Sequence, residues 1–566
     1  MKFFSKKRHE EIEFDQIFID ASNLPSFNSG RLEGKFEVPL TRTSIYAVGV
    51  VFTLIAVVFF GQAFRLQVVE GNEFRDRSEN NRLDRSLIIA ERGVIYDRRG
   101  ERLAWNTTDS AQPDFPARAY AERRGLGQLL GYIRYPKKDT SGFYFRTAYE
   151  GVSGIEAQYD EILAGLNGEQ LIEVDATQAV ISEHVMHQSV PGKSITLSID
   201  AEFSEALHDA LATTAEDYGF RSGAGVVMDV HTGEIIALAN YPSFDPEILA
   251  SGVDHVAIDA LNNDARKPFL NRIMSGLYTP GSIVKPFVAY AALVERIIDP
   301  LKEIVSTGSI TIPNPYNPSN PSIFNDWRAH GATDMRRAIA VSSNVYFYTI
   351  GGGFKGQEGL GIDRINTYMR LFGFGEPTGT PLAGERAGTV PNPEWKREIF
   401  DDDWRLGDTY FTAIGQFGFQ VSPLQMLRAY GAVANGGTML TPHFVEGESA
   451  PSYDLNLDQD ALSVIREGMR GSVLDGTARA LNRSDVQFAG KTGTAQTGAR
   501  NEFINSWAVG YFPYEEPQYV FVTLLEQGPA RNLFGAAPTM SRVVDWMKKN
   551  RPEYLGIETV APVHDE

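Results

Sequence analysis

Three short segments of the chain carry the residue types with which a serine enzyme transfers an acyl group. In chain order they are Ser282-Ile283-Val284-Lys285, Ser342-Ser343-Asn344 and Lys491-Thr492-Gly493-Thr494. A serine hydroxyl is a poor nucleophile until a base takes its proton, and a lysine serves as that base only when its pKa falls. Each string alone occurs by chance in long proteins. The ordered set of three predicts acyl transfer through a serine.

The first segment supplies a nucleophile and its base. Pro280 and Gly281 precede Ser282, and a helix-compatible run over 287–298 follows it. Ser282 is therefore expected in the first turn of a helix, with the Cβ atoms of Ser282 and Lys285 roughly 5–6 Å apart on one face. Burial beside a second cation, for which Lys491 is the candidate, would lower the pKa of Lys285.

The second segment follows a helical pattern over 335–341. A hydroxyl and an amide two residues apart point to one side when the link is extended or a tight turn. We expect Ser342 to relay a proton to the leaving amine, and Asn344 to orient Lys285 and the substrate amide. Taken alone, Ser-Ser-Asn is equally typical of a helix cap.

The third segment lies in a run, 488–495, that suits a strand at the edge of a sheet. Gly493 would let a ligand backbone approach closely, and a peptide donor can pair with such an edge. We expect the Thr492 and Thr494 hydroxyls to bind its terminal carboxylate, with positive potential from Lys491. The backbone N–H groups of Ser282 and Thr494 would form the oxyanion hole.

Composition excludes several other classes of function. The 566-residue chain carries a formal net charge of −19, which argues against nucleic acid as a partner. It has no cysteine, so thiolate catalysis, disulfides and Cys-based metal sites are ruled out. The only close histidine pair, His184 and His187, is expected to be solvent-exposed, and no metal or other cofactor is expected. A phosphate loop is the alternative interpretation of Gly490-Lys491-Thr492, but Asp485 stands where that motif requires its first glycine.

Residues 45–64 form an uncharged apolar run of a length that spans roughly 30 Å as a helix. A buried core helix and a cleaved signal peptide, with Gly61-Gln62-Ala63 as a small-x-small site, are the alternatives. An uncleaved single-pass anchor is favoured because the run is long and follows a 44-residue tail. Flanking Lys and Arg residues do not decide the orientation. We expect the large C-terminal part outside the cytoplasm, since it lacks cysteine.

The remaining patterns divide the chain into a β-rich region and a larger α+β region. The first shows a hairpin signal over 92–104 and a strand over 194–199, with a boundary near residue 200. The second is expected to contain helices over 201–218 and 540–549, and strands over 225–230, 234–239, 506–511 and 519–525. This order predicts an antiparallel sheet flanked by helices. The expected division is 1–44 cytoplasmic tail, 45–64 membrane helix, 65–200 pedestal, 201–549 catalytic domain and 550–566 C-terminal tail.

From the anchor to about residue 549 the chain resembles class B penicillin-binding proteins, which are monofunctional peptidoglycan D,D-transpeptidases. The resemblance rests on the three segments above and on several longer strings: RGVIYDRRGERLA, GVSGIEAQYD, LAGLNG, GVVMDVHTGEIIALANYPSFDP, YTPGSIVKP, VSSNVYFY, SPLQMLRAYGAVANGG and AGKTGTAQ. It implies the α+β fold of penicillin-binding proteins and serine β-lactamases, with a helical subdomain, set on a β-rich pedestal behind one N-terminal transmembrane helix.

The resemblance also implies a reaction and partners. A stem peptide ending in D-Ala-D-Ala would acylate Ser282 and lose D-Ala, and an amine of a neighbouring stem peptide would resolve the acyl-enzyme into a crosslink. β-Lactams would acylate the same serine and remain. The catalytic domain would face the periplasm or cell surface. Glycan polymerisation would fall to a membrane glycosyltransferase of the shape-elongation-division-sporulation family, contacted through the pedestal and transmembrane helix.

Two details of the resemblance point in different directions. Residues 381–396 and 404–409 resemble the elongation-type enzymes of rod-shape growth, whereas Ile414-Gly415-Gln416-Phe417-Gly418 departs from their usual I-G-Q-G and is closer to division-type relatives. We favour the elongation type. The alternative functions are a serine hydrolase, as in D,D-carboxypeptidases or β-lactamases, and a non-catalytic penicillin-binding sensor or scaffold.

Overall fold

The computed structural model describes residues 42–72, 74, 83–108, 114–140, 144–174, 180–314, 317, 319–498, 500–532 and 535–557. Apart from 42–44, the expected cytoplasmic tail lies outside the described residues, as does the 558–566 part of the expected C-terminal tail. The chain divides into two units, residues 1–84 with 172–182 and residues 85–171 with 183–566, and each is considered by itself.

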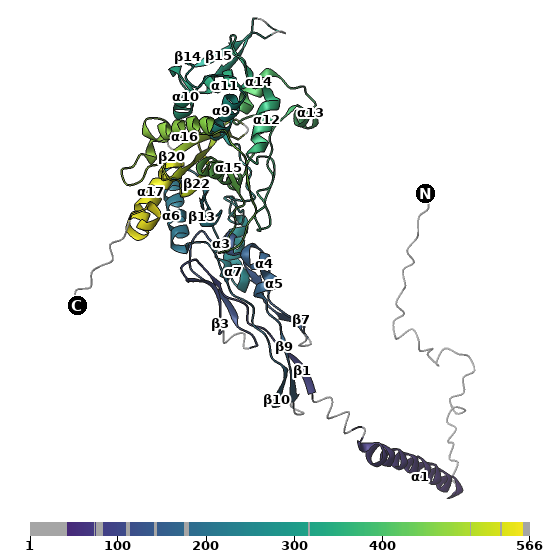
Figure 1. The fold of residues 1–566 in the computed structure, drawn as a ribbon. Helices are drawn as coiled ribbons and strands as arrows, with labels where there is room; N and C mark the ends of the chain where they lie inside the picture. The colour runs from purple at the N-terminus through teal and green to yellow at the C-terminus, as the bar shows by residue number, and fades with distance from the viewer. Residues whose placement is uncertain are drawn as a thin grey trace, which may run out of the picture. The chain divides into compact units, whose positions relative to one another are not determined.

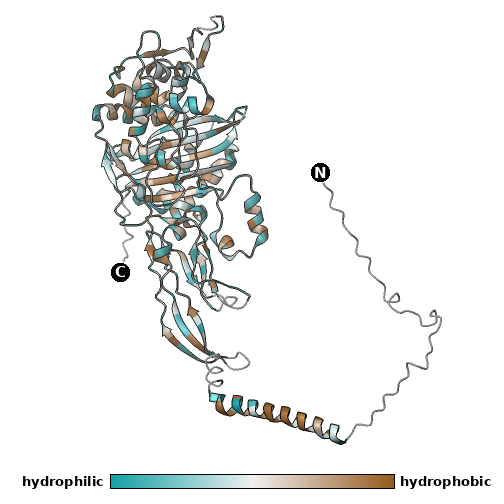
Figure 2. Ribbon diagram, turned by 90° about the vertical axis from the view of Figure 1, so that its right-hand side faces the viewer, coloured by the Kyte–Doolittle hydropathy of each residue, from teal (hydrophilic) through white to brown (hydrophobic). Residues whose placement is uncertain are grey.

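The first unit contains α1 (Arg42–Phe64), which continues into a π-helical turn, η4 (Arg65–Val69). Apolar residues follow one another along α1 with no polar face, as its hydropathy colouring shows (Figure 2). None of its residues is buried against the other described residues. Among the described residues it is the one helix long and apolar enough to cross a membrane.

A four-stranded sheet opens the second unit, with the order β11–β2–β3–β4. Strand β2 (Ile95–Tyr96) pairs antiparallel with β3 (Arg102–Thr107), which confirms the predicted hairpin, and β3 pairs with β4 (Ala117–Tyr120). The strand predicted over 194–199 is shorter than expected. β11 (Ile195–Thr196) runs parallel to β2, and the residues after it bond on both sides: the Leu197 N–H donates to the carbonyl of Tyr96 and the Ser198 N–H to the carbonyl of Phe444.

Short elements complete this β-rich part: β1 (Leu83–Ile88), α3 (Gly127–Leu130), β5 (Ile133–Arg134), β6 (Lys137–Lys138), β7 (Tyr144–Arg146), β8 (Glu150–Gly151), α4 (Gly154–Gln158), α5 (Asp160–Leu163), β9 (Gly168–Val174) and β10 (Val180–His187). A buried ion-pair cluster supports it, since Glu156 on α4 pairs with Arg92 at 2.6 Å and with Arg118 at 2.8 Å. His184 and His187 on β10 are exposed, as expected.

The catalytic region is built on a five-stranded antiparallel sheet with the order β13–β12–β22–β21–β20. The strands are β12 (Ser222–Asp229), β13 (Ile235–Tyr241), β20 (Ala489–Thr497), β21 (Phe503–Phe512) and β22 (Tyr519–Pro529). All four predicted strands are present. β12 ends one residue before its predicted end and β13 begins one residue after its predicted start, whereas β21 extends beyond both predicted ends and β22 beyond its C-terminal end. The segment with Lys491 occupies β20, at an edge of the sheet, as the sequence indicated.

Alternating residues of the sheet contribute to two separate cores. Val227 and Phe521 pack with α6 (Ala201–Tyr218) and α17 (Ala537–Asn550), which lie against each other on one face (Figure 1). Val226 and Val522 belong to the core of the other face, with α15 (Pro423–Asn435). Successive side chains of a strand therefore pack into the cores on opposite faces, as expected of a sheet covered by helices on both sides.

Local signals explain why the α6 prediction is correct at both ends. Asp200 caps the helix by accepting a hydrogen bond from the backbone of Phe203 at 3.0 Å, and Gly219 ends it in the left-handed conformation at φ 71°. α17 begins three residues before its predicted start.

The second unit also contains a helical subdomain and several small hairpins. Its elements are α7 (Pro246–Ser251), α8 (His255–Asn263), η5 (Gly281–Val284), α9 (Lys285–Val294), β14 (Ile304–Ser306), β15 (Ser309–Ile312), β16 (Ser322–Asn325), β17 (Gly331–Thr333), α10 (Met335–Val341), α11 (Asn344–Gly352), α12 (Gly361–Leu371), α13 (Pro393–Phe400), α14 (Leu406–Ala413), β18 (Thr438–Leu440), β19 (Ser452–Asp454), α16 (Gln459–Leu474), η6 (Arg479–Leu481) and η7 (Pro552–Leu555). α9 and α16 contact each other, and α16 lies along β20.

Candidate active site

Ser282 lies in the 3₁₀ turn η5, which leads directly into α9 with Lys285 as its first residue. The predicted helical start is therefore present, with a tighter first turn. Gly281 makes this turn possible, because its φ of 59° is a conformation that side chains rarely adopt. Its backbone N–H donates to the carbonyl of Gly415 at 2.9 Å, which fixes the turn to the loop after α14.

Buried aromatic donors hold the turn from two other directions. The Tyr430 hydroxyl on α15 donates to the carbonyl of Ile283 at 2.6 Å, and the Trp507 indole on β21 donates to the carbonyl of Thr279 at 3.1 Å. Gly493 brings β20 against the same turn, since a Cβ atom there would lie 2.7 Å from the carbonyl oxygen of Pro280. The close approach that Gly493 permits is thus to the chain's own backbone.

The Lys285 amine is completely buried and contacts only neutral oxygens. Its Nζ donates to Asn344 Oδ1 at 2.7 Å, to the Ser342 carbonyl at 2.8 Å and to Ser342 Oγ at 3.2 Å. Burial lowers the pKa of Lys285 to about 7, although the charge of Asp326 opposes this shift. A neutral amine is therefore well populated at neutral pH, which is the state that a general base needs.

Lys491 places a second buried amine beside Ser342. Its Nζ donates to Ser342 Oγ at 2.9 Å and to the Thr492 carbonyl at 2.8 Å. Burial, assisted by the charge of Lys285, holds the pKa of Lys491 well below its ordinary value. Because Ser342 Oγ accepts from both amines, its own hydrogen remains free to be donated.

The second segment forms the tight turn between α10 and α11. Ser342 ends α10 in the left-handed conformation at φ 59°, and Asn344 is the first residue of α11. Ser343 caps α11, accepting a hydrogen bond from the backbone of Tyr346 at 3.3 Å. The helix-cap interpretation is thus correct for Ser343, while Ser342 and Asn344 both face Lys285.

Thr492 and Thr494 lie on the edge strand β20 with their side chains on the same side of it. The Thr492 hydroxyl donates to Thr477 Oγ1 at 2.6 Å, whereas Thr494 is exposed. A Cβ atom on Gly281 would lie 2.8 Å from the Thr494 carbonyl oxygen, so the backbones on either side of Ser282 and Thr494 adjoin. The two N–H groups expected to form the oxyanion hole therefore belong to neighbouring segments of backbone.

Two polar residues of the site were missed by the sequence reasoning. Thr477 follows α16 and bonds to Thr492, and the Asp326 carboxylate, between β16 and β17, bonds to the backbone of Asn344 at 2.9 Å. Each is an isolated residue in a loop, with no spacing to either serine that would mark it. Only the tertiary contacts identify them.

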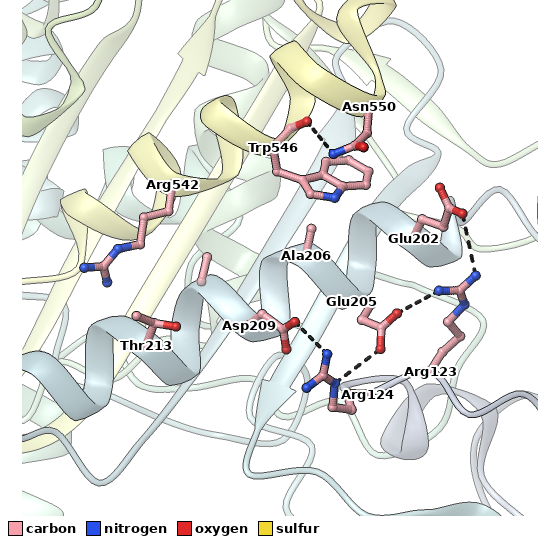
Figure 3. Close-up of a pocket in the computed structure, with 11 residues that line it drawn as sticks. Arg123, Arg124, Glu202, Glu205, Ala206, Asp209, Thr213, Arg542, Trp546 and Asn550 are labelled. Atoms are coloured by element: carbon pink, nitrogen blue, oxygen red, sulfur yellow. Dashed lines mark hydrogen bonds and ion pairs between the residues drawn. The ribbon is translucent and has the colours of Figure 1, made fainter.

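A separate charged cleft lies between α6, α17 and the residues before α3 (Figure 3). There Arg123 pairs with Glu205 at 2.7 Å and Arg124 with Asp209 at 2.8 Å. None of the residues of the three segments lines this cleft. Arg123 and Arg124 pair with acidic residues of the cleft, and Arg542 pairs with Asp217 outside it. The described parts of the chain contain no group of three side chains able to hold a metal ion.

Family models match most of the chain. Residues 223–545 match the transpeptidase domain of penicillin-binding proteins, and residues 114–197 match the penicillin-binding protein dimerisation domain. The second match falls on the β-rich region and the first on the region that carries all three segments.

Individual relatives have the same arrangement. Peptidoglycan D,D-transpeptidase MrdA of Haemophilus influenzae is 29% identical over 90% of this chain and 92% of its own. A penicillin-binding protein, PBP2, of Helicobacter pylori, solved in complex with MreC, has a TM-score of 0.68 at 26% identity, covering 82% of this chain and 99% of that one. A chain from a peptidoglycan synthase complex has a TM-score of 0.70 at 27% identity, covering 92% and 99%. The chain therefore belongs to the class B penicillin-binding proteins, in which a transpeptidase domain follows a dimerisation domain.

Proposed function

We propose that this protein is a peptidoglycan D,D-transpeptidase that works through an acyl-enzyme on Ser282. The observation that carries the proposal is the buried Lys285 amine, one turn from Ser282, whose pKa burial lowers to about 7 and whose Nζ donates to neutral oxygens. Relatives named as D,D-transpeptidases support the substrate, a stem peptide ending in D-Ala-D-Ala. β-Lactams would acylate the same hydroxyl.

In the acylation step, a proton moves from Ser282 through Lys285 and Ser342 to the leaving amine. Ser282 Oγ attacks the carbonyl carbon between the two D-alanines while its proton passes to Lys285 Nζ. The N–H groups of Ser282 and Thr494 stabilise the oxyanion. Ser342 donates its hydrogen to the leaving nitrogen, and the proton held by Lys285 replaces it. D-Ala departs, leaving an ester on Ser282.

The second half-reaction reverses these transfers with a different amine. An amine of a neighbouring stem peptide gives up a proton to Ser342 and Lys285 as it attacks the ester carbonyl, and Ser282 leaves with a proton. Asn344 orients Lys285 and the donor amide, and Lys491 with Thr492 and Thr494 binds the donor carboxylate. The edge of β20 offers backbone groups for pairing with the peptide.

For the cell, we propose a single-pass inner-membrane protein of the elongation type, anchored by α1, with its catalytic domain outside the cytoplasm. The similarity to MrdA supports the type. We keep the boundaries predicted from the sequence, with residues 65–200 as the proposed pedestal and 201–549 as the proposed transpeptidase domain. The pedestal and α1 are the proposed contacts for a membrane glycosyltransferase, since one structural relative comes from a peptidoglycan synthase complex and another binds MreC.

Two measurements test this function. Intact-mass analysis after incubation with a penicillin, followed by peptide mapping, is expected to find one adduct on Ser282, and none in Ser282→Ala. Incubation with lipid-linked glycan and a partner glycosyltransferase is expected to yield crosslinked dimers. D-Ala release without dimers would indicate a carboxypeptidase, and an adduct on another residue would refute the assigned nucleophile.

A further inference from the structure

Asp326 occupies a position that none of the three sequence segments indicates. It follows β16, and its carboxylate is completely buried. Burying a carboxylate is costly unless hydrogen bonds replace its water. Here one oxygen accepts from the Ser343 hydroxyl at 2.8 Å, the Val345 N–H at 3.0 Å and the Ser306 hydroxyl at 3.2 Å. The other accepts from the N–H groups of Asn344 and Trp327, both at 2.9 Å.

These contacts tie Asp326 to the first turn of α11. Asn344 and Val345 are the first two residues of that helix, whose free N–H groups and dipole favour a negative charge. The same Asn344 offers its side-chain oxygen to Lys285 Nζ at 2.7 Å. One residue therefore links the buried carboxylate to the buried amine, through its N–H on one side and its amide oxygen on the other.

The titratable groups described around Asp326 do not place a positive charge in contact with its carboxylate. His330 approaches its carboxylate at 3.5 Å, but burial lowers the pKa of His330 and keeps the ring neutral at neutral pH. Arg328 stacks on the exposed Trp327 ring. The charge of Asp326 raises the pKa of Lys285 on α9 against the effect of burial, and the charge of Lys285 in turn lowers the pKa of Lys491 on β20.

We propose that Asp326 is a positioning residue for acylation: it holds the Ser342–Asn344 turn before α11 in place and puts a buried negative charge next to Asn344, the residue that binds Lys285. The inference rests on the proposed function, because it assigns Asp326 to the same acylation of Ser282. Asp326 itself touches neither Ser282 nor the reacting atoms. Its effect passes through Asn344, Ser343 and the electrostatic field at Lys285.

Asp326→Asn separates this role from a purely structural one. The amide puts N–H donors where the carboxylate accepted from Ser343 and Val345, so the turn shifts, and the negative charge is lost. We expect the rate of acylation by a fluorescent penicillin, normalised to titrated active sites, to fall about tenfold to a hundredfold. Without the charge the pKa of Lys285 drops further, so the rising limb of the pH–rate profile moves to lower pH.

Two further variants divide the effect. Ser343→Ala keeps the charge but removes one contact, so its rate should fall while the limb stays in place. Asp334→Asn is the matched control, because Asp334 caps the other end of α10–α11 by accepting from the backbone of Arg337 at 2.8 Å, and asparagine caps equally well. The acylation rate of Asp334→Asn and the pH at which its pH–rate profile rises should equal those of the wild type.

The outcomes distinguish this inference from the proposed function beneath it. A wild-type protein that no penicillin labels would refute the proposed function. If the wild type is labelled but Asp326→Asn acylates at the same rate per active site, with the rising limb of its pH–rate profile at the same pH, the role of Asp326 alone would be overturned. An equal shift of the limb in Ser343→Ala would overturn the assignment of the shift to charge.

Discussion

Lys285 and Lys396 are both buried lysines, yet their surroundings give them opposite properties. The Lys285 amine touches three neutral oxygens, and burial lowers its pKa to about 7. Burial also acts on Lys396, but hydrogen bonds from its amine to Asp408 at 2.7 Å and Asp402 at 2.9 Å outweigh it and raise the pKa. The comparison teaches that the carboxylates in contact, not burial alone, decide between a base and a structural cation.

The region around Lys396 also explains the departure from I-G-Q-G in the sequence. Phe417, the additional residue, has a φ of 61° and packs its ring against Trp395 and Trp404. Lys396 lies 5.7 Å from the centre of that ring. Since Gly415 in the same loop binds Gly281, this region supports the turn that contains Ser282, whereas the Lys285 region contains the proposed base.

The largest difference between the two regions should appear when each lysine becomes arginine. Arginine keeps a positive charge but cannot become neutral in a protein. Lys285→Arg is therefore expected to slow penicillin acylation by about 10²–10⁴-fold, measured as adduct formation by mass spectrometry. Lys396→Arg is the matched control and should acylate at a rate close to that of the wild type. A Lys285→Arg rate within tenfold of wild type would break the comparison.

Lys396→Met should reveal the structural role of the second lysine. It leaves the buried Asp408 carboxylate without its cation, a change expected to lower the free energy of unfolding by about 3 kcal/mol. Urea unfolding of the purified protein measures this. A loss below about 1 kcal/mol would place Lys396 among ordinary surface ion pairs.

The pH dependence of acylation should follow Lys285 alone. Below a pKa of about 7 the amine is protonated and cannot accept the Ser282 proton, so the rate should fall about tenfold per pH unit on the acid side. Above it the rate should level off. The Lys396→Met variant should have the same midpoint, because Lys396 stays protonated across this range in the wild type and so contributes nothing to the profile. A midpoint near the ordinary lysine value would contradict the assignment of the base.

The smallest effect is expected next to Lys396 in the sequence. Arg397 pairs with Asp403 at 3.3 Å, and their side chains are 67% and 88% exposed. Arg397→Ala should change the free energy of unfolding by at most about 0.5 kcal/mol in the same urea experiment. If Arg397→Ala lowered the free energy of unfolding as much as Lys396→Met, solvent exposure would not explain the difference between the Arg397–Asp403 and Lys396–Asp408 pairs.

Much of the fold was predictable because its signals are local. The ends of α6 are marked by Asp200 and Gly219, and the strands of the large sheet by their apolar runs. The prediction of a strand over 194–199 was too long, since β11 covers only Ile195–Thr196; the partners of the following residues are long-range, with Leu197 bonding to Tyr96 and Ser198 to Phe444. Local patterns do not carry such contacts between distant segments.

The sequence by itself determined which residue types are available for acyl transfer, because the three segments are short and their order is visible in the chain. Only the tertiary structure decided what surrounds each of them. The amine of Lys285 has its lowered pKa because folding removes it from water and gives it neutral oxygens, and Asp326 and Thr477 reach the site from loops distant in sequence. Burial and long-range contacts form only when the chain folds, so the spacing of residues in the sequence does not reveal them.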